Sequence, residues 1–100
     1  MGAKTGGALP THHEATADDL AKVVESFASA ALRVQQAGCD GIEVHAAHGY
    51  LISTFLSPHW NRRTDAYGST VNGRTRLLRE VVSAIRGRCG TDFAIIVRLE

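Results

Sequence analysis

The chain has 100 residues, which is room for one small domain. Hydrophobic residues make up 44% of it and charged residues 21%, a composition that excludes a disordered chain and is typical of a globular one. Eleven Lys and Arg against ten Asp and Glu give a net charge of +1, so the basic excess of a protein that binds nucleic acid or an anionic membrane is missing. No apolar run approaches the ~20 residues of a membrane helix, and the first residues lack the apolar core of a signal peptide. We therefore expect a cytoplasmic protein with no nucleic-acid and no membrane partner.

Residues 1–15 contain several glycines and few apolar side chains, which predicts an N-terminal loop or tail with His12 and His13 in solvent. A helix is predicted to begin after Thr16, because Asp19 three residues later completes a pattern similar to a capping box. Its apolar face recurs at steps of three and four residues, at Leu20, Val23, Val24, Phe27, Ala31 and Val34. Gly38 suits the left-handed position that follows a helix end.

A short strand is predicted at 41–45, where Ile42 and Val44 point to one face and Glu43 and His45 to the other. A long loop follows over 46–71. The spacing then predicts a second helix over 73–86, with Asn72 as its N-cap and Gly87 or Gly90 as its stop. The nearly continuous apolar run at 93–99 predicts a strand that is buried on both faces.

The element order helix, strand, helix, strand predicts an α/β fold with parallel β/α units. Two units cannot close a sheet, and an eight-stranded barrel needs about 250 residues. We therefore expect a fragment of a (β/α)8 TIM barrel with about two β/α units, and hence a piece of a larger protein. The loop after the first strand is longer than such a unit requires, and loops of this kind lie at the barrel face where barrel enzymes have their active sites.

The most informative group consists of His45, His48 and Tyr50. It places two imidazoles and a phenol at the end of the first strand and directly after it. Three interpretations are open from the residues alone. The first is a pair of hydrogen-bond donors for a developing oxyanion with a proton donor beside it. The second is a metal site, for which His59 is the best third ligand. The third is a structural role for one or both histidines in the core.

Three sequence blocks occur here in a characteristic order and spacing: Gly38 to Ile52 (GCDGIEVHAAHGYLI), Phe55 to Pro58 (FLSP) and Asn61 to Ser69 (NRRTDAYGS). With Val97-Arg98-Leu99 they resemble the Old Yellow Enzyme family, also called NADH:flavin oxidoreductases, over about residues 16–99. The resemblance implies an FMN-binding (β/α)8 barrel, of which residues 16–100 would be a part containing strands four and five. Family members read Gly-Gly where this chain has Gly68-Ser69, and Asn where it has Gly73.

The resemblance also implies an activity, in which NADH or NADPH reduces FMN and the flavin passes a hydride to an activated alkene such as an enone. It assigns His45 and His48 to binding the electron-withdrawing group of the substrate, Tyr50 to proton donation and Arg98 to contact with the flavin. It implies no metal at these residues. Longer relatives add FAD and an iron–sulfur cluster, and the parent protein is expected to be a homo-oligomer. The alternatives are a metal-dependent barrel lyase or hydrolase that uses the histidine pair, and an inactive truncated remnant. The isolated chain is expected to bind FMN weakly and to be inactive.

The remaining polar side chains receive structural interpretations first. Glu43 shares the face of His45, where we favour a structural, buried carboxylate over one that pairs with an arginine or supports a histidine. Arg62, Arg63 and Asp65 are predicted to order the loop through ion pairs. Cys39 and Cys89 stand fifty positions apart, which fits neither a redox pair nor a zinc knuckle and predicts two small, half-buried thiols.

Overall fold

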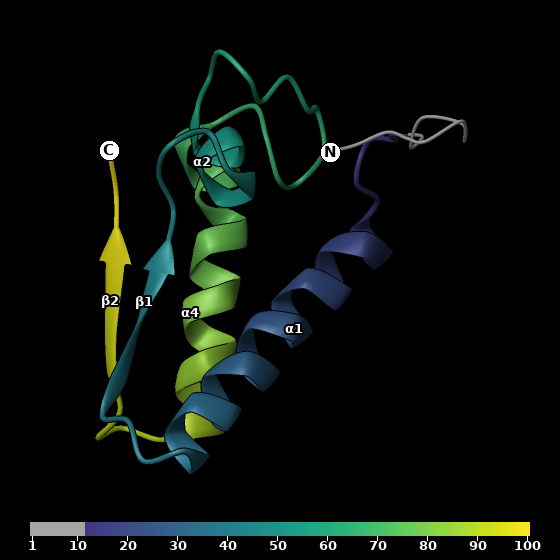
Figure 1. Ribbon diagram of the computed structural model, residues 1–100. Coiled ribbons are helices and arrows are strands. Elements are labelled where there is room, and N and C mark those ends of the chain that lie inside the picture. The colour runs from purple at the N-terminus through teal and green to yellow at the C-terminus, as the bar shows by residue number, and fades with distance from the viewer. Residues whose placement is uncertain (1–11) are drawn as a thin grey trace, which may run out of the picture.

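A computed structural model describes residues 12–100. Its elements follow in the order α1 (Ala17–Gln36), β1 (Gly41–His45), α2 (Leu51–Leu56), α3 (Val71–Arg74), α4 (Arg76–Cys89) and β2 (Ala94–Arg98). The two strands pair in parallel, with Gly41 opposite Ala94 and His45 opposite Arg98. Both long helices lie on one side of this small sheet (Figure 1). The predicted α/β order of helix, strand, helix and strand is confirmed, with two short helices added.

Helix α1 begins and ends as the sequence predicts. The Thr16 hydroxyl accepts a hydrogen bond from the Asp19 backbone N–H, and the Asp19 carboxylate accepts one from the Thr16 backbone N–H. At the other end Gly38 has φ of 99°, and the N–H groups of Gly38 and Cys39 donate to carbonyls of the last turn. This reciprocal pattern satisfies backbone groups that a helix end would leave unpaired.

The Asp19 carboxyl makes the start of α1 sensitive to acid. Hydrogen bonds from the Thr16 backbone N–H and from the His13 ring hold its pKa below the ordinary value. The folded state therefore gains stability from Asp19 above the ordinary carboxyl pKa of about 4, and loses that gain as the pH falls through the lower folded value. We expect urea unfolding to show a larger loss of stability below about pH 4 in wild-type protein than in Asp19→Asn, in which only other carboxyls with a lowered pKa still contribute. Asp18→Asn, one residue earlier, should behave like wild type.

The core lies between the two long helices and the sheet. Leu20 of α1, Val44 of β1 and Leu77, Val81 and Ile85 of α4 are at most 1% exposed. Helix α2 adds Ile52 and Phe55 to the same cluster. Burial of such side chains stabilises by about 1.5–3 kcal/mol each, so this cluster fixes how the strands lie against α1 and α4. No helix of residues 12–100 has the length and apolar character that crossing a membrane requires.

Residues 12–100 do not cover the second face of the sheet, and we call it the open face. It consists of Glu43 and His45 from β1 and Ala94, Ile96 and Arg98 from β2. Ile96 is 59% exposed there, whereas Ile95 and Val97 pack against the core on the other face. The predicted burial of residues 93–99 on both faces is therefore wrong for this chain, because the described elements cover one face alone.

The second long helix begins later than predicted. Residues Val71–Arg74 form the separate short helix α3, whose N-cap is Thr70 with its hydroxyl accepting the Gly73 N–H at 3.0 Å. Asn72 is therefore inside α3 and is not an N-cap. Helix α4 ends at Gly90, which is one of the two glycines predicted to stop it. A Cβ on Gly73 would collide with the Gly68 carbonyl oxygen, so this close approach between loop and helix requires glycine.

Ser69 adopts φ of 71°, a left-handed conformation that costs a residue with a Cβ about 1–2 kcal/mol. Its hydroxyl donates to the Arg63 carbonyl at 3.1 Å, so both Ser69→Gly and Ser69→Ala lose this bond. We expect Ser69→Gly to be more stable than Ser69→Ala by about 1 kcal/mol, measured by urea unfolding of the complete gene product that contains these residues. Equal stability of the two variants would contradict the left-handed conformation.

Candidate active site

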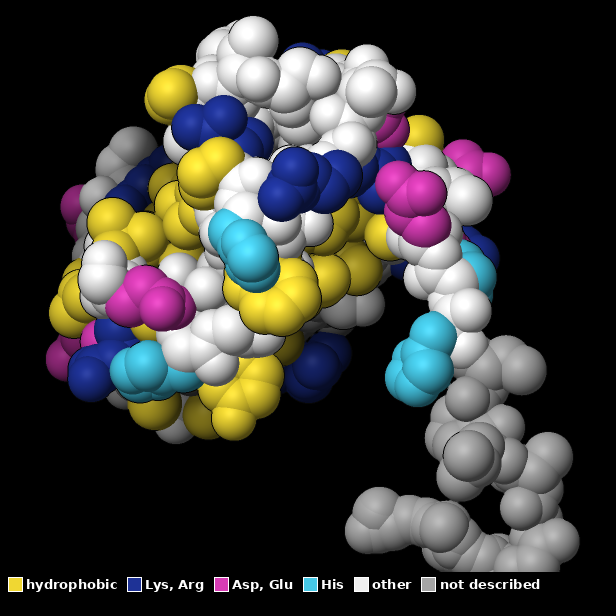
Figure 2. Space-filling view, turned by 90° about the horizontal axis from the view of Figure 1, so that it is seen from above, with side chains coloured by type: hydrophobic (Ala, Val, Ile, Leu, Met, Phe, Trp, Pro, Cys, Tyr) yellow, Lys and Arg dark blue, Asp and Glu magenta, His cyan; other side chains and the backbone are white. Residues whose placement is uncertain are grey.

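The loop that follows β1 brings three aromatic rings together. Val44 points into the core, so the alternation of the strand turns His45 to the open face. The centroid of the His45 ring lies 5.1 Å from that of His48 and 5.1 Å from that of Tyr50. Seen from the end where the strands finish, histidine side chains lie among apolar ones (Figure 2). The structure thus joins the three residues that the sequence singled out into one cluster at the carboxyl ends of the strands.

A tight turn links His45 to Tyr50. His48 and Gly49 have φ of 63° and 75°, and the Tyr50 N–H donates to the Ala47 carbonyl at 3.4 Å. Tyr50 then serves as the N-cap residue of α2 and is 63% exposed. The left-handed turn brings the His48 ring to the His45 ring, and the exposed phenol of Tyr50 lies beside the His45 ring.

Arg98 lies next to this cluster because it is the register partner of His45 on β2. Its Nη1 lies 4.0 Å from Oε2 of Glu43, and both side chains are about half exposed. Glu43 therefore pairs with an arginine of the open face, the interpretation that the sequence favoured less, and it is not buried. A permanent guanidinium cation at this place can bind an anionic ring or phosphate. The donor set thus fits the electron-rich edge of a reduced flavin, with Arg98 as the residue that would hold it.

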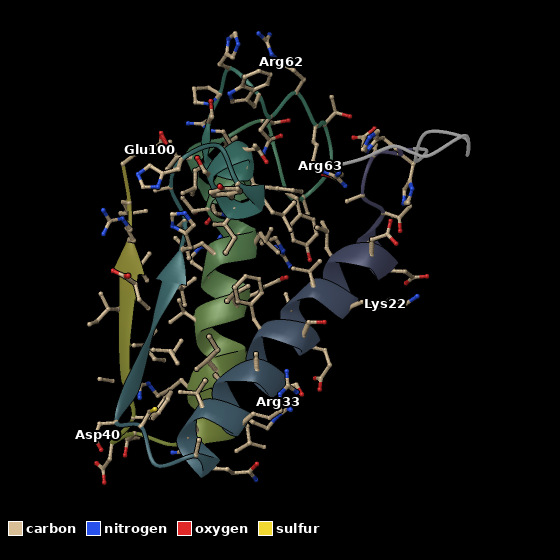
Figure 3. The ribbon with its side chains drawn as sticks, in the orientation of Figure 1. Lys22, Arg33, Asp40, Arg62, Arg63 and Glu100 are labelled. Carbon is tan, nitrogen blue, oxygen red and sulfur yellow. The ribbon has the colours of Figure 1, made fainter. Side chains whose placement is uncertain are left out.

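Glu100 reaches the same turn from the end of β2, beside the loop after β1 (Figure 3). One of its carboxylate oxygens, Oε1, accepts a hydrogen bond from the His48 backbone N–H and a second one, at 2.8 Å, from the Ser53 hydroxyl. These two hydrogen bonds, that of Ser53 first, hold the pKa of Glu100 below its ordinary value. Neither Glu100 nor Ser53 is predicted from the sequence to lie at this turn.

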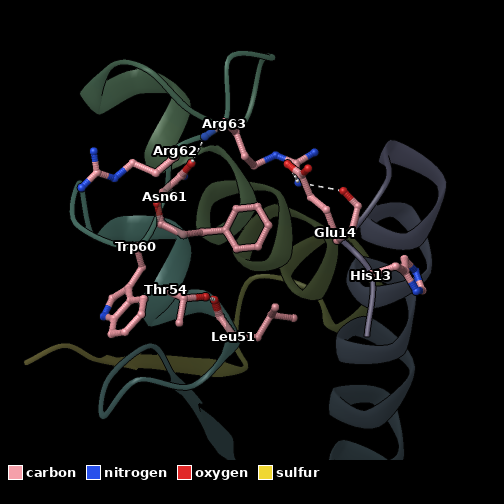
Figure 4. A pocket seen from close by; sticks show the side chains of 10 residues that line it. His13, Glu14, Leu51, Thr54, Trp60, Asn61, Arg62 and Arg63 are labelled. Atoms are coloured by element: carbon pink, nitrogen blue, oxygen red, sulfur yellow. Dashed lines mark hydrogen bonds and ion pairs between the residues drawn. The ribbon is translucent and has the colours of Figure 1, made fainter. Parts of the chain in front are cut away.

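Two cavities flank helix α2. The larger, about 490 Å³, lies between residues 13–15, α2 and the following loop, and does not include the histidine cluster (Figure 4). The smaller, about 390 Å³, adjoins the cluster. Its lining residues are Ala46, Gly49, Ser53, Leu56, Ser57, Trp60, Leu99 and Glu100. Because it borders the turn of His48, the smaller cavity is the better candidate for part of a substrate site.

The loop between α2 and α3 is ordered by polar contacts of Arg63 and Asn61. Arg63 makes a two-pronged ion pair with Asp65, with Nη2 to Oδ2 at 2.6 Å, and also donates to the Ala15 carbonyl at 2.7 Å. The predicted loop-ordering role of these two residues is confirmed, whereas Arg62 donates to the His59 carbonyl instead. Asn61 is 9% exposed and satisfies three backbone groups, which the sequence alone did not indicate.

A metal site needs further ligands beside the histidine pair. Within residues 12–100 no group of three His, Cys, Asp or Glu side chains could hold a metal ion together. His59, the proposed third ligand, packs edge to face against Trp60 at 4.8 Å between ring centroids. The described geometry therefore gives the metal interpretation no supporting ligand set. Cys39 and Cys89 are both free thiols, but Cys39 is exposed and Cys89 is buried, so the prediction that both are half-buried is wrong.

Comparison with known proteins identifies the family of this chain. Residues 2–100 match the NADH:flavin oxidoreductase / NADH oxidase family. The chain is 50% identical over 86 residues to a metal reductase of Desulforamulus reducens, covering 86% of this chain and 13% of the relative. It is 49% identical over 78 residues to an NADPH dehydrogenase of Halalkalibacterium halodurans, covering 78% and 23%.

Solved structures give the same result. A complex of 2-naphthoyl-CoA reductase has a TM-score of 0.84 at 36% identity, over 86% of this chain and 13% of that one. Old Yellow Enzyme from a Pichia species has a TM-score of 0.80 at 38% identity, over 85% and 22%. The chain belongs to the NADH:flavin oxidoreductase / NADH oxidase family of oxidoreductases. It spans between 13% and 26% of the length of the curated relatives it matches.

Proposed function

We propose that residues 16–100 supply strands four and five of an FMN-binding (β/α)8 barrel, and that the complete protein reduces activated alkenes with NADH or NADPH. The observation that carries this proposal is the cluster of His45, His48 and Tyr50 beside Arg98 on the open face. The match to a flavin oxidoreductase family supports the flavin and the nicotinamide reductant.

The two histidines bind and polarise the substrate. Reduction of an enone builds negative charge on its carbonyl oxygen, and ring N–H donors of His45 and His48 stabilise that charge as it develops. The two rings lie 5.1 Å apart at an angle of 62°, so their N–H groups can converge on one oxygen between them. The structural interpretation of the pair is less favoured, because both rings lie at the exposed end of the sheet.

Tyr50 and Arg98 complete the site. The exposed phenol of Tyr50, beside His45, donates a proton to the α-carbon of the substrate. Arg98 would hold FMN through its guanidinium, oriented by Glu43. The chemistry that bound FMN would supply is transfer of a hydride from NADH or NADPH to the β-carbon of the alkene.

A flavin titration of the complete gene product tests this function. We expect FMN to bind and NADH or NADPH to bleach its visible absorbance, and 2-cyclohexen-1-one, a simple enone, to restore it under anaerobic conditions. Metal analysis of the same sample addresses the alternative. Failure to bind flavin, together with one equivalent of bound metal, would replace the proposed function by the metal-dependent one.

A further inference from the structure

The backbone of His48 has an intrinsically unfavourable conformation. Its φ of 63° lies in the left-handed region, which is unfavourable for a residue with a Cβ. The imidazole points to His45 only while this turn persists, because the side-chain direction follows the backbone. Some contact must therefore compensate for the unfavourable conformation.

That contact comes from outside the loop. Glu100, which follows β2, accepts the His48 backbone N–H and the Ser53 hydroxyl with the same carboxylate oxygen. The Ser53 hydroxyl oxygen in turn accepts the Gly49 N–H at 3.2 Å. Two consecutive N–H groups of the turn are thus satisfied by one connected pair of side chains. Hydrogen bonds to an ionised carboxylate are roughly twice as strong as neutral ones.

The hydrogen bonds of the Glu100 carboxylate go to the His48 turn and to Ser53. Among residues 12–100 no Lys or Arg forms an ion pair with Glu100, unlike Glu25, which pairs with Arg88 at 2.6 Å. Ser53, from the first turns of α2, is 9% exposed, so its hydroxyl is fixed between the Gly49 N–H and the carboxylate. A surface glutamate without a structural role would not accept hydrogen bonds from both the His48 N–H and the Ser53 hydroxyl.

We propose that Glu100 and Ser53 are positioning residues that hold the His48 turn and thereby direct the His48 imidazole at the substrate oxygen. The substrate part of this inference rests on the proposed function. The conformational part does not, because it concerns only hydrogen bonds within the chain. The two parts can therefore fail separately.

The conformational part is tested by NMR on the complete gene product labelled with ¹⁵N-histidine. A backbone N–H that donates to a carboxylate resonates downfield, so we expect the His48 amide proton to move upfield in Glu100→Ala and in Ser53→Ala. Glu100→Gln keeps an oxygen acceptor without the charge and should give a smaller shift. Glu25→Ala, which removes an exposed, ion-paired glutamate of α1, is the matched control and should leave the resonance in place. An unmoved His48 amide in Glu100→Ala would overturn the proposal.

The substrate part is tested by steady-state kinetics with 2-cyclohexen-1-one. Loss of a hydrogen bond to a charged group corresponds to roughly a tenfold or larger effect, so we expect the KM for the enone to rise about tenfold in Glu100→Ala. Glu100→Gln should recover part of the loss, and Glu25→Ala should match wild type. An unchanged KM despite a shifted His48 amide resonance would overturn the substrate part of the proposal. An inactive wild-type protein whose His48 amide still shifts in Glu100→Ala would refute the proposed function and leave the positioning intact.

Discussion

Replacement of His45 by alanine is expected to lower kcat for enone reduction roughly 100- to 1,000-fold, the cost of removing one donor from an oxyanion site. The His45 ring is 5.1 Å from His48 and from Tyr50, so its loss removes the member that contacts both others. Binding of FMN should persist, because Arg98 stays in place on β2. Stopped-flow reoxidation of the reduced flavin by 2-cyclohexen-1-one measures the effect directly.

His59→Ala is the matched control for this experiment. His59 lies on the loop after α2, and its ring packs edge to face against Trp60 rather than against the His45 cluster. We expect this variant to reoxidise at the wild-type rate. Equal losses in His45→Ala and His59→Ala, accompanied by loss of a bound metal, would contradict the oxyanion assignment.

Replacement of Asn61 by alanine is expected to destabilise the protein by about 2–4 kcal/mol, because it leaves buried backbone groups without partners. The Asn61 Nδ2 group donates to the Phe55 carbonyl at 2.7 Å and to the Tyr67 carbonyl at 2.8 Å. Its Oδ1 accepts the Arg63 N–H at 3.0 Å. One buried side chain thus joins the end of α2 to both parts of the loop. Urea unfolding of the complete gene product gives the free-energy change.

Asn72→Ala provides the comparison for Asn61. Asn72 is exposed on α3, where water replaces any bond that its side chain gives up, so its removal should cost within about 0.5 kcal/mol. We also expect Asn61→Ala to increase proteolysis between residues 57 and 70. A destabilisation no larger than that of Asn72→Ala would show that the three hydrogen bonds of Asn61 contribute little.

The regular elements could be predicted from the sequence where local rules act alone. The ends of α1 follow from Thr16, Asp19 and Gly38, since capping depends on neighbouring residues. The direction of His45 follows from the alternation of a strand. The pairing of His45 with Arg98 could be expected only through the family resemblance, because strand register depends on packing between distant segments.

The short helices could not be predicted in the same way. Helix α2 has six residues, which is too short to be stable in isolation. It forms because Ile52 and Phe55 are buried in the core, a tertiary effect that no local pattern indicates. The sequence predicts too early a start for α4, because Asn is a good capping residue in general. In the structure Thr70 caps the separate helix α3 instead.

The polar contacts of the site depend on still longer separations. Ser53 and Glu100 are 47 positions apart, and their hydrogen bond exists only because β2 returns beside β1. Asn61 resembles an ordinary loop residue in sequence, and only its burial shows that it organises the loop. Sequence motifs therefore located the chemical groups, whereas the structure was needed to identify the side chains that hold them.

The parallel register of β1 and β2 has a consequence for recombination between related genes. In our proposal His45 faces the substrate and Arg98 faces the flavin. The two residues stand opposite each other and are encoded within one contiguous stretch. An exchange of the segment 41–98 would transfer both with their mutual spacing intact. Chimaeras with crossovers outside this segment should accordingly remain active more often than chimaeras that divide it, which makes these residues a natural unit for gene shuffling.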